Sequence, residues 1–585
     1  MTRILTGVGV GPGDPELVTV KAVRVLREAD VVLVPVLALT QAASGPEPGR
    51  AETIIRAYVA ADRIKRLEFA LNDTGGVTPR RAAAWQAAAA VVAAEFAGGA
   101  ATVAFGTLGD PNLYSTFSYL AQTVRELVPD VRVETVAGIT AMQDLASRAG
   151  ISLAEGTEHL TLVPLNAGAA ALDQALASGG TVVGYKAGAA ASPGPDDLRR
   201  RLTAAGRLEG AVLGSRLGLP GQLIAPAADV LPTRDPDGGP ARDPAGEPAA
   251  PDAALPYLST LIAPVPRGAR GASLGATAQT GARATAQTGA QAEVPAAGPA
   301  RETRSAGRVT FIGAGPGAPD LLTLHGARAI AAADIVIWAS SLVHPDVLQH
   351  ASDGAEIVDS AQLPMEGVLP SYERAAREAL AVARVHSGDP SLWGAIQEQL
   401  EQCATLGLET EIVPGVSSFT AVAARIGREL TIPEVAQSVI LTRLGGGKTP
   451  MPPGERVADF ARHGTTMALF LSAARSGQLQ DELASGGYPP GTPCVVAYQV
   501  TWPDELIIEC RLEDLAATIR EHKLWKHTLV LVGPGLAASG SRSHLYHPGH
   551  FHGFRKAERQ ARQQLREADA RQTGARQPGA RQAPS

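Results

Sequence analysis

The chain has 585 residues, of which 45% are hydrophobic and 4% aromatic, and its formal net charge is −6. This length predicts several compact units, and the weakly acidic balance argues against whole-chain attraction to nucleic acid or to an anionic membrane. Three cysteines without a CxxC pair argue against a disulfide framework and a cysteine zinc site. We expect a cytoplasmic protein with no membrane span and no required metal.

The chain contains a long internal repeat. Residues 9–19, GVGPGDPELVT, recur as residues 313–323, GAGPGAPDLLT. Further matches follow in the same order: GDPNLY at 109–114 with GDPSLW at 388–393, and VAGITA at 136–141 with VPGVSS at 413–418. The collinear matches indicate a duplication, and a period this long predicts that each copy is a complete folding unit.

Short β-branched runs alternate with longer alanine-rich stretches in each copy. The pattern predicts strands at 101–105, 131–136 and 181–185 and a helix at 80–97. This alternation is typical of α/β units with mostly parallel sheets.

Composition divides the chain further. We expect a first unit at 1–267 with a surface insertion at 232–254, and a second unit at 308–555. The Gly-, Ala-, Thr- and Gln-rich stretch 268–307 predicts a flexible linker, and the charged stretch 556–585 predicts a tail that is largely disordered.

Two glycine-rich segments superficially resemble nucleotide-binding loops. Gly9, Gly11 and Gly13 follow a predicted strand, but the third glycine is one position early for GxGxxG and no acidic residue closes the second strand. Because the match to the dinucleotide motif is incomplete, a dinucleotide-dependent oxidoreductase stays as an alternative function and not as the preferred one. The run GGGKT at 445–449 is followed by prolines that forbid the helix a phosphate loop needs, so we reject it.

The Gly-Asp-Pro segments each follow a predicted strand, where α/β sheets bind ligands. Gly109 and Gly388 would let the backbone approach a ligand. Asp110 and Asp389 are interpreted in two ways, as hydrogen-bond acceptors for the ligand or as caps of the following helix. Both interpretations stay open at this point.

The order of these segments resembles the tetrapyrrole methylase family of the cobalamin pathway. Residues 107–120, 215–222 and 257–264 resemble the precorrin-2 C(20)-methyltransferases, whereas residues 441–452 and 543–556 resemble the precorrin-4 C(11)-methyltransferases. The resemblance implies a bifunctional enzyme that methylates both precorrins, in cobalt-free or cobalt-containing form, with S-adenosylmethionine as methyl donor. A scaffold role for one non-catalytic half is a further alternative.

In that family, two α/β subdomains of each unit enclose S-adenosylmethionine in the cleft between them. Matched motif by motif, the resemblance implies a set of cofactor-binding residues in each copy. These are Pro12, Leu108, Gly109, Asp110, Thr140, Ala141 and Thr260 in the first copy, and Pro316, Ser387, Gly388, Asp389, Ser417, Ser418, Leu471 and Thr528 in the second. Lys186 stands where relatives have an apolar residue, so its ammonium is expected to point away from the sulfonium or to contact a substrate carboxylate.

Precorrins carry many carboxylates, so the resemblance implies arginines at the substrate site. The candidates are Arg50, Arg216 and Arg443, each with a surface ion pair as the alternative interpretation. Tetrapyrroles are the expected partners. Homodimerisation and pairing of the two copies within one chain both stay open.

The residue that accepts the proton after methyl transfer is not identified by the sequence. The candidates are Asp14, Tyr114, His386 and Asp389. Ala318 replaces Asp14 in the second copy, which excludes a base shared by both copies at that position. Histidines at 544–552 have irregular spacing in a Pro-Gly segment and do not predict a metal site.

Overall fold

The computed structural model describes residues 2–36, 48–69, 79–189, 191–232, 255–266, 306–432, 435–446, 450–452 and 454–537. The expected insertion beyond residue 232, the expected linker up to residue 305 and the expected tail lie outside the described residues. Within the described part, no helix is long and apolar enough to cross a membrane.

Each copy begins with a five-stranded sheet, and the two sheets have the same strand order, β3-β2-β4-β1-β5 and β13-β12-β14-β11-β15. All neighbouring strands in them are parallel. The first sheet consists of β1 (Ile4–Gly9), β2 (Val31–Val36), β3 (Ile64–Glu68), β4 (Thr102–Thr107) and β5 (Arg132–Val136). The second consists of β11 (Arg308–Gly313), β12 (Ile335–Trp338), β13 (Glu356–Asp359), β14 (Ala381–His386) and β15 (Glu409–Val413).

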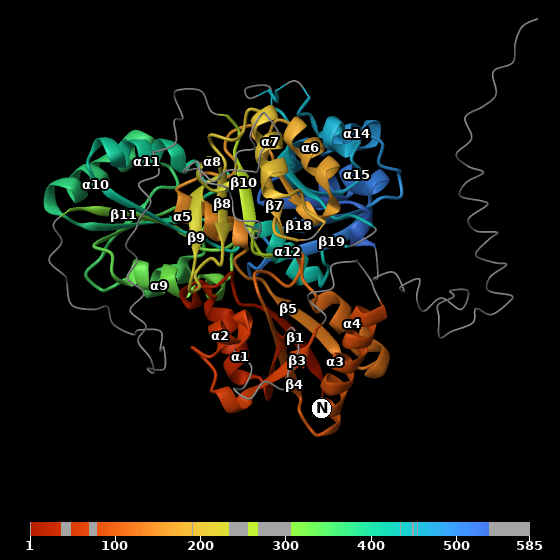
Figure 1. The fold of residues 1–585 in the computed structure, drawn as a ribbon. Helices are drawn as coiled ribbons and strands as arrows, with labels where there is room; N and C mark the ends of the chain where they lie inside the picture. Colours follow the sequence, from red (N-terminus) through yellow and green to blue (C-terminus); the bar gives the residue numbers. More distant parts are fainter. Residues whose placement is uncertain are drawn as a thin grey trace, which may run out of the picture.

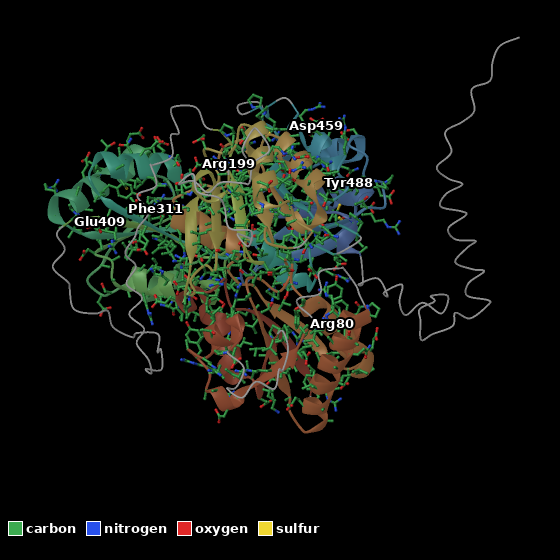
Figure 2. All side chains as sticks on the ribbon, viewed as in Figure 1. Arg80, Arg199, Phe311, Glu409, Asp459 and Tyr488 are labelled. Carbon is green, nitrogen blue, oxygen red and sulfur yellow. The ribbon has the colours of Figure 1, made fainter. Side chains whose placement is uncertain are left out.

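Helices cover both faces of the first sheet (Figure 1). Helices α1 (Val20–Glu28) and α2 (Arg50–Ile55) pack on one face, and α3 (Pro79–Ala97) and α4 (Phe117–Leu127) pack on the other. The second sheet carries α9 (Leu324–Ala331), α10 (Met365–Glu378) and α11 (Ile396–Thr405). Phe311 lies inside this layer, whereas Arg80 and Glu409 lie on the surface (Figure 2).

The predicted strands and helix are confirmed, with ends that differ by one or two residues, as is the α/β class. The two five-stranded sheets are parallel as expected, whereas the ten-stranded sheet that joins the two copies is mixed. Of its described strand pairs, only β16 (Val439–Arg443) with β17 (Thr466–Phe470) and β6 (Leu160–Pro164) with β7 (Thr181–Tyr185) are parallel. The alternation of apolar runs and alanine-rich stretches was sufficient to predict the strands and the helix. Strands that helices cover on both faces are apolar along their whole length, so they stand out in the sequence.

The two copies meet in one ten-stranded sheet of order β19-β18-β20-β17-β16-β6-β7-β10-β8-β9. The first copy supplies β6 (Leu160–Pro164), β7 (Thr181–Tyr185), β8 (Val212–Ser215), β9 (Leu223–Pro226) and β10 (Thr260–Ala263). The second supplies β16 (Val439–Arg443), β17 (Thr466–Phe470), β18 (Pro493–Tyr498), β19 (Leu506–Arg511) and β20 (Thr528–Val532). Antiparallel pairing of β16 with β6 joins the copies, with Ile440 opposite Thr161.

Helices also flank this central sheet (Figure 1). Helices α6 (Ala169–Ala177), α7 (Pro195–Ala204) and α8 (Ala227–Val230) pack on the strands of the first copy. Helices α13 (Val457–Ala461), α14 (Ser476–Ser485) and α15 (Leu515–Glu521) pack on the strands of the second. Helices α5 (Ala141–Ala149) and α12 (Ser418–Ile426) connect each small sheet to the central one and pack in the middle of the molecule.

One hydrophobic cluster is shared by the two copies, beside other clusters that lie within a single copy, and the statement that each copy is a complete folding unit stays a prediction. A single buried cluster takes Leu145 and Leu160 from the first copy together with Phe419 and Val439 from the second. The sheet edge at β6 and β16 would be exposed in either copy alone. A repeat in sequence reports a shared ancestral fold, but not whether the two copies bury apolar surface against each other.

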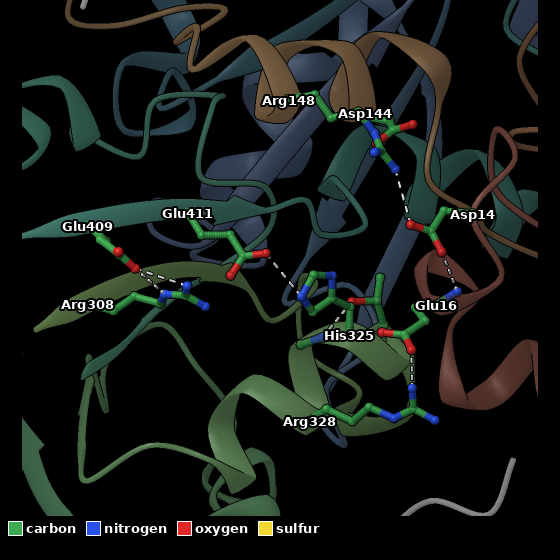
Figure 3. A network of polar contacts seen from close by, with 11 residues as sticks. Asp14, Glu16, Asp144, Arg148, Arg308, His325, Arg328, Glu409 and Glu411 are labelled. Atoms are coloured by element: carbon green, nitrogen blue, oxygen red, sulfur yellow. Dashed lines mark hydrogen bonds and ion pairs between the residues drawn. The ribbon is translucent and has the colours of Figure 1, made fainter. Parts of the chain in front are cut away.

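A second contact joins the first turns of α1 and α9. The amide of Val20 donates to the carbonyl of Leu322 at 3.0 Å, and the amide of Leu324 donates to Val18 at 3.0 Å. Arg24 pairs with Asp320 at 2.8 Å, and Arg328 pairs with Glu16 (Figure 3). These reciprocal contacts give the pair of copies an approximate two-fold relation.

Candidate functional site

Three loops meet at the carboxyl ends of β4, β1 and β5. The amide of Gly109 donates to the carbonyl of Gly11 at 2.9 Å. A Cβ atom on Gly138 would lie 2.3 Å from the Gly109 carbonyl oxygen, and one on Gly9 would lie 2.7 Å from the same atom. No side chain larger than hydrogen is accommodated at these contacts, so glycine is required for the backbones to touch.

The second copy repeats this contact with its own three loops. Gly388 donates to the Gly315 carbonyl at 2.8 Å, and a Cβ atom on Gly415 would lie 2.2 Å from the Gly388 carbonyl oxygen. Gly109 and Gly388 both have a φ of +68° and face open space on the side where a Cβ would point. The glycines therefore hold loops together and leave the Gly-Asp-Pro backbone exposed to a ligand, and they do not form a phosphate cradle.

The aspartates of the two Gly-Asp-Pro segments tie the loops together. Asp110 accepts hydrogen bonds from the amides of Asn112 at 2.8 Å and Gly138 at 3.0 Å, and it is 1% exposed. Asp389 accepts from the amides of Ser391 at 2.9 Å and Gly415 at 3.1 Å. Burial raises the pKa of Asp110 to about 7 and raises the pKa of Asp389, while these amide donors lower both pKa values.

The interpretation of the aspartates as helix caps is wrong, because α4 and α11 begin several residues later, at Phe117 and Ile396. Asp110 and Asp389 instead accept hydrogen bonds within the loop that precedes α4 or α11 and from the loop beside it. We keep them as candidate site residues that position the loop backbone.

The other expected site residues lie in three places. Pro12 and Pro316 lie in the turns after β1 and β11, and Leu108 and Ser387 directly follow β4 and β14. Residues 140–141 and 417–418 lie at the start of α5 and α12, whereas Thr260 and Thr528 begin β10 and β20 and Leu471 directly follows β17. Thr140 and Ser417 are the N-caps of these two helices. Thr260 pairs with Gly214 across the sheet, and the amide of Ala187 donates to the carbonyl of Ser259 at 2.9 Å. The strand end at Thr260 is thus joined to the turn that carries Lys186.

Four non-glycine residues near these loops have left-handed backbone conformations. Tyr114 and Trp393 have φ values of 51° and 53°, and Lys186 and Leu471 have φ values of 60° and 52°. Each pair occupies the same place in the two copies. Such conformations are costly for these side chains and gather at functional sites. The sequence gives no signal for them, because glycine and asparagine are absent at all four positions.

The side chains around the Gly-Asp-Pro loop differ between the two copies. The rings of Tyr114 and Tyr185 lie 5.0 Å apart, and the Lys186 ammonium lies 5.4 Å from the centre of the Tyr114 ring. In the second copy the rings of Trp393 and Phe470 lie 4.7 Å apart. Leu471 follows Phe470 and is 69% exposed, which leaves an apolar side chain free to meet a ligand.

The ammonium of Lys186 faces a carboxyl group from the other copy. Glu429 is buried, accepts hydrogen bonds from Ser118 and Thr431, and raises the pKa of Lys186 against the larger lowering effect of burial. Burial raises the pKa of Glu429 itself to about 7. The sequence missed Glu429 because its counterpart in the first copy is Ser152 and because Ser118, which donates to it, lies 311 residues away in the chain.

The segment that carries Glu429 is bonded to the first Gly-Asp-Pro loop. The amide of Leu430 donates to the Asn112 carbonyl at 2.9 Å, and the amide of Tyr114 donates to Thr431 Oγ1 at 2.7 Å. In the reverse direction, the amide of Trp393 donates to the Ala154 carbonyl at 2.8 Å. The Gly-Asp-Pro loop of each copy is therefore held partly by the other copy.

Two of the expected substrate arginines are affected by the charge of another arginine. Burial lowers the pKa of Arg50, and the positive charge of Arg216 lowers it further. Arg475 lowers the pKa of Arg443 in the same way. Nε and Nη2 of Arg443 are buried and have no hydrogen-bond partner among the described residues. Within the described part of the chain no ion pair involves Arg443, and its assignment to the substrate site stays a prediction.

The proton-acceptor candidates differ in their contacts. Asp14 accepts from Arg148 at 3.1 Å and thereby joins the glycine turn to α5 (Figure 3). Tyr114 donates its hydroxyl to the Gln437 carbonyl at 2.8 Å, and burial raises its pKa. Both carboxylate oxygens of Asp389 accept hydrogen bonds. His386 has an unpartnered Nε2, and burial lowers the pKa of His386 well below its ordinary value.

The two segments rejected as a phosphate loop and as a metal site lie partly or wholly outside the described residues. The turn after β16 leads into residues 450–452 and 454–455, and helix α13 begins only at Val457, although Lys448 and Thr449 themselves lie outside the description. No group of metal-binding side chains occurs within the described ranges. The histidines at 544–552 lie outside them.

Known proteins resemble both copies. A model of the tetrapyrrole (corrin/porphyrin) methylases matches residues 4–229 and 308–516. The chain is 40% identical over 253 residues to the cobalt-precorrin-4 C(11)-methyltransferase of Methanocaldococcus jannaschii, a match that takes in 43% of this chain and 97% of that protein. It is 42% identical over 239 residues to the precorrin-4 C(11)-methyltransferase of Mycobacterium tuberculosis, with 41% of this chain and 95% of that protein covered.

Solved structures of relatives also match a length of about one copy. A cobalt precorrin-4 methyltransferase is 40% identical, with a TM-score of 0.38 and coverage of 40% of this chain and 96% of that one. A uroporphyrin-III C-methyltransferase from Thermus thermophilus, complexed with S-adenosylhomocysteine, is 28% identical, with a TM-score of 0.33 and coverage of 39% and 99%. Because the family model matches both copies and most of the chain, this protein belongs to the tetrapyrrole (corrin/porphyrin) methylases.

Proposed function

We propose that this chain is a bifunctional, S-adenosylmethionine-dependent methyltransferase of corrin precursors in the cytoplasm. The first half methylates precorrin-2 at C-20, and the second half methylates precorrin-4 at C-11. The observation that carries this proposal is the repeated contact of three glycine loops, which builds a ligand-facing Gly-Asp-Pro turn in each copy.

The support differs between the halves. Relatives named as precorrin-4 C(11)-methyltransferases are 40–42% identical over a length of one copy. For the first half, the proposal rests on its longer motifs and on a cleft that is more polar than its counterpart. Both halves keep the full set of loops, which argues against a scaffold role for either.

In each cleft the backbone of the Gly-Asp-Pro turn and the N-terminus of α5 or α12 would hold the methyl donor. The carbon of the macrocycle attacks the donor methyl group, the bond from methyl to sulfur breaks, and its electron pair stays on sulfur. A proton is then lost from the macrocycle. The chain contributes mainly alignment of the two molecules and exclusion of water.

Arginines would bind the substrate carboxylates. Arg443 supports this role in the second cleft because two of its buried nitrogen atoms lack a partner. The positive charge of Arg216 lowers the pKa of Arg50, and a substrate carboxylate would relieve this repulsion. Lys186 adds a further cation to the first cleft.

Mass spectrometry tests the proposal directly. The full chain is incubated with S-adenosylmethionine and either precorrin-2 or precorrin-4, and we expect each substrate to gain the mass of one methyl group. No gain on precorrin-4 would overturn the assignment of the second half, and no gain on precorrin-2 would overturn that of the first.

The oxidoreductase alternative is separated by thermal stability. A ligand that binds the folded state raises the melting temperature. We expect S-adenosylmethionine or S-adenosylhomocysteine to raise it and NAD to leave it unchanged. The reverse result would favour the dinucleotide enzyme.

A further inference from the structure

One buried side chain connects the two clefts. Gln143 lies in the first turn of α5 and is 0% exposed. Its Oε1 accepts hydrogen bonds from the amide and the hydroxyl of Thr140, both at 2.9 Å. Its Nε2 donates to Asp389 Oδ2 at 3.0 Å and to the carbonyl of Gly415 at 2.6 Å.

The four contacts fix the orientation of the amide. The oxygen faces a backbone N–H, which can only donate, and the nitrogen faces a carbonyl oxygen, which can only accept. A reversed amide would oppose both. The side chain therefore bridges the helix cap of the first cleft and the aspartate and glycine turn of the second.

Within the described part of the chain, only the first half supplies a side chain that forms such a bridge. Thr420 stands at the corresponding position of α12, and its hydroxyl donates to the carbonyl of Ser417 in its own copy at 3.0 Å. Among the described residues, Asp110 accepts hydrogen bonds from backbone amides of its own copy, at Asn112 and Gly138. The second cleft thus depends on a side chain of the first half that has no counterpart in the reverse direction among the described residues.

The environment makes this contact energetically important. Asp389 is 2% exposed, so a lost donor cannot be replaced by bulk water. When a buried charged group loses a hydrogen-bond partner, the free-energy cost is far larger than for the same loss at an exposed group. Thr140, at the other end of the bridge, caps the helix whose first turn faces the first cleft.

We propose that Gln143 is a positioning residue for the methyl-donor site of the second half, and that it couples this site to the first. This inference rests on the proposed function, because it assumes that both clefts bind the donor. It predicts that the affinity of the second cleft depends on the α5 turn of the first half. Coupling of this kind is reciprocal for binding.

Gln143→Glu is the sharpest variant. A glutamate at this position keeps the oxygen that accepts from Thr140, as in an ordinary capping box, but turns a second oxygen toward Asp389 and the Gly415 carbonyl. The cap of the first half is preserved while the donor to the second half is lost. Ser147→Ala removes a hydroxyl that donates within α5, to the carbonyl of Asp144 at 2.9 Å, and serves as the control, with both sites expected to keep their affinity.

Calorimetric titration of the full chain with S-adenosylhomocysteine measures both sites. We expect the wild-type chain to bind two equivalents. In Gln143→Glu, one site should weaken about 10-fold or more, as the loss of a charge-assisted hydrogen bond predicts, while the other changes less than about 2-fold. Gly109→Leu, which distorts the first Gly-Asp-Pro turn, should remove the site that stays tight in Gln143→Glu.

The outcomes are distinct. Two unchanged sites in Gln143→Glu would overturn the inference, because Gln143 would then position neither site. Equal weakening of both sites would also overturn it, because Gln143 would then act only through the hydrophobic cluster that the copies share. No binding by the wild-type chain would overturn the proposed function instead. If Gln143→Glu fails to fold, Gln143→Met is titrated, and a second site that keeps wild-type affinity overturns the inference.

Discussion

The two clefts have nearly the same backbone and different side chains. Tyr114, Tyr185 and Lys186 in the first cleft are replaced by Trp393, Phe470 and Leu471 in the second, and even the left-handed φ values recur. The backbone that holds the loops has been kept, whereas the groups that face the ligand have changed from polar to apolar. This difference supports the proposal that the copies use the same methyl donor and act on different tetrapyrroles.

The contributions across the interface differ as well. The second copy gives the first cleft a buried carboxyl group, Glu429, whereas Ser152 stands at the matching position of the first copy. The first copy gives the second cleft the amide of Gln143, whereas Thr420 stands at the matching position. Ser152 donates its hydroxyl to the carbonyl of Ser391 in the second copy at 3.4 Å, so Ser152 and Glu429 both contact the other copy, but with different chemistry.

Separation of the halves should have the largest effect. Residues 1–266 and 306–537 expressed alone lose the pairing of β6 with β16 and expose the shared core. We expect each isolated half to lose its methyl-transfer activity by roughly 100-fold or more, because the cleft loops lose their partners. Co-expression of the two halves should restore both activities, and full activity of either half alone would contradict the shared core.

Gly138→Ala and Gly415→Ala should each silence one cleft. The new methyl group would lie 2.3 Å from the Gly109 carbonyl oxygen or 2.2 Å from the Gly388 carbonyl oxygen, so the loops must move apart. A displacement of about 1 Å can lower a rate by about 100-fold. We expect Gly138→Ala to remove methylation of precorrin-2 only and Gly415→Ala that of precorrin-4 only, measured as kcat/KM on each substrate. Loss of both reactions in either variant would show that the clefts are not separate.

Lys186→Leu gives the first cleft the side chain that the second has at Leu471. It removes the cation beside Glu429 and a group that can meet a substrate carboxylate. We expect kcat/KM for precorrin-2 to fall about 10- to 100-fold through a higher KM, with precorrin-4 methylation unchanged. Leu471→Lys is the matched exchange in the second half. An unchanged KM for precorrin-2 in Lys186→Leu would remove this lysine from the substrate site.

Glu429 should make stability depend on pH. Its pKa rises from 4.5 to about 7 in the folded chain, where it faces Lys186 and Tyr114. The folded state therefore holds a proton that the unfolded state releases, so this stabilisation is complete below about pH 4.5 and is lost as pH rises through about 7. The size is at most roughly 3 kcal/mol.

Urea unfolding at pH 5 and pH 8 measures this effect. We expect Glu429→Gln to reduce the pH dependence of the free energy of unfolding relative to the wild-type chain. A residual dependence should remain from Asp110, whose pKa is also raised to about 7. An identical pH dependence in both proteins would show that Glu429 titrates normally.

Sequence reasoning reached the parts of the molecule that are set by local pattern. Strand ends, the glycine turns and the Gly-Asp-Pro loops were predicted because β-branched runs, glycine spacing and repetition report on nearby backbone. Glu429 and Gln143 could not be predicted in this way, since each acts on a loop of the other copy. Nor could the role of Asp110, because its partner Gly138 is brought close only by the neighbouring strands β4, β1 and β5.

The central claim is that one folded unit contains two methyl-donor clefts. The stoichiometry of S-adenosylhomocysteine binding to the purified, full-length chain at equilibrium tests this claim most directly. We predict two equivalents per chain, one lost in Gly138→Ala and the other in Gly415→Ala. A single equivalent in the wild-type chain, or none, would contradict it.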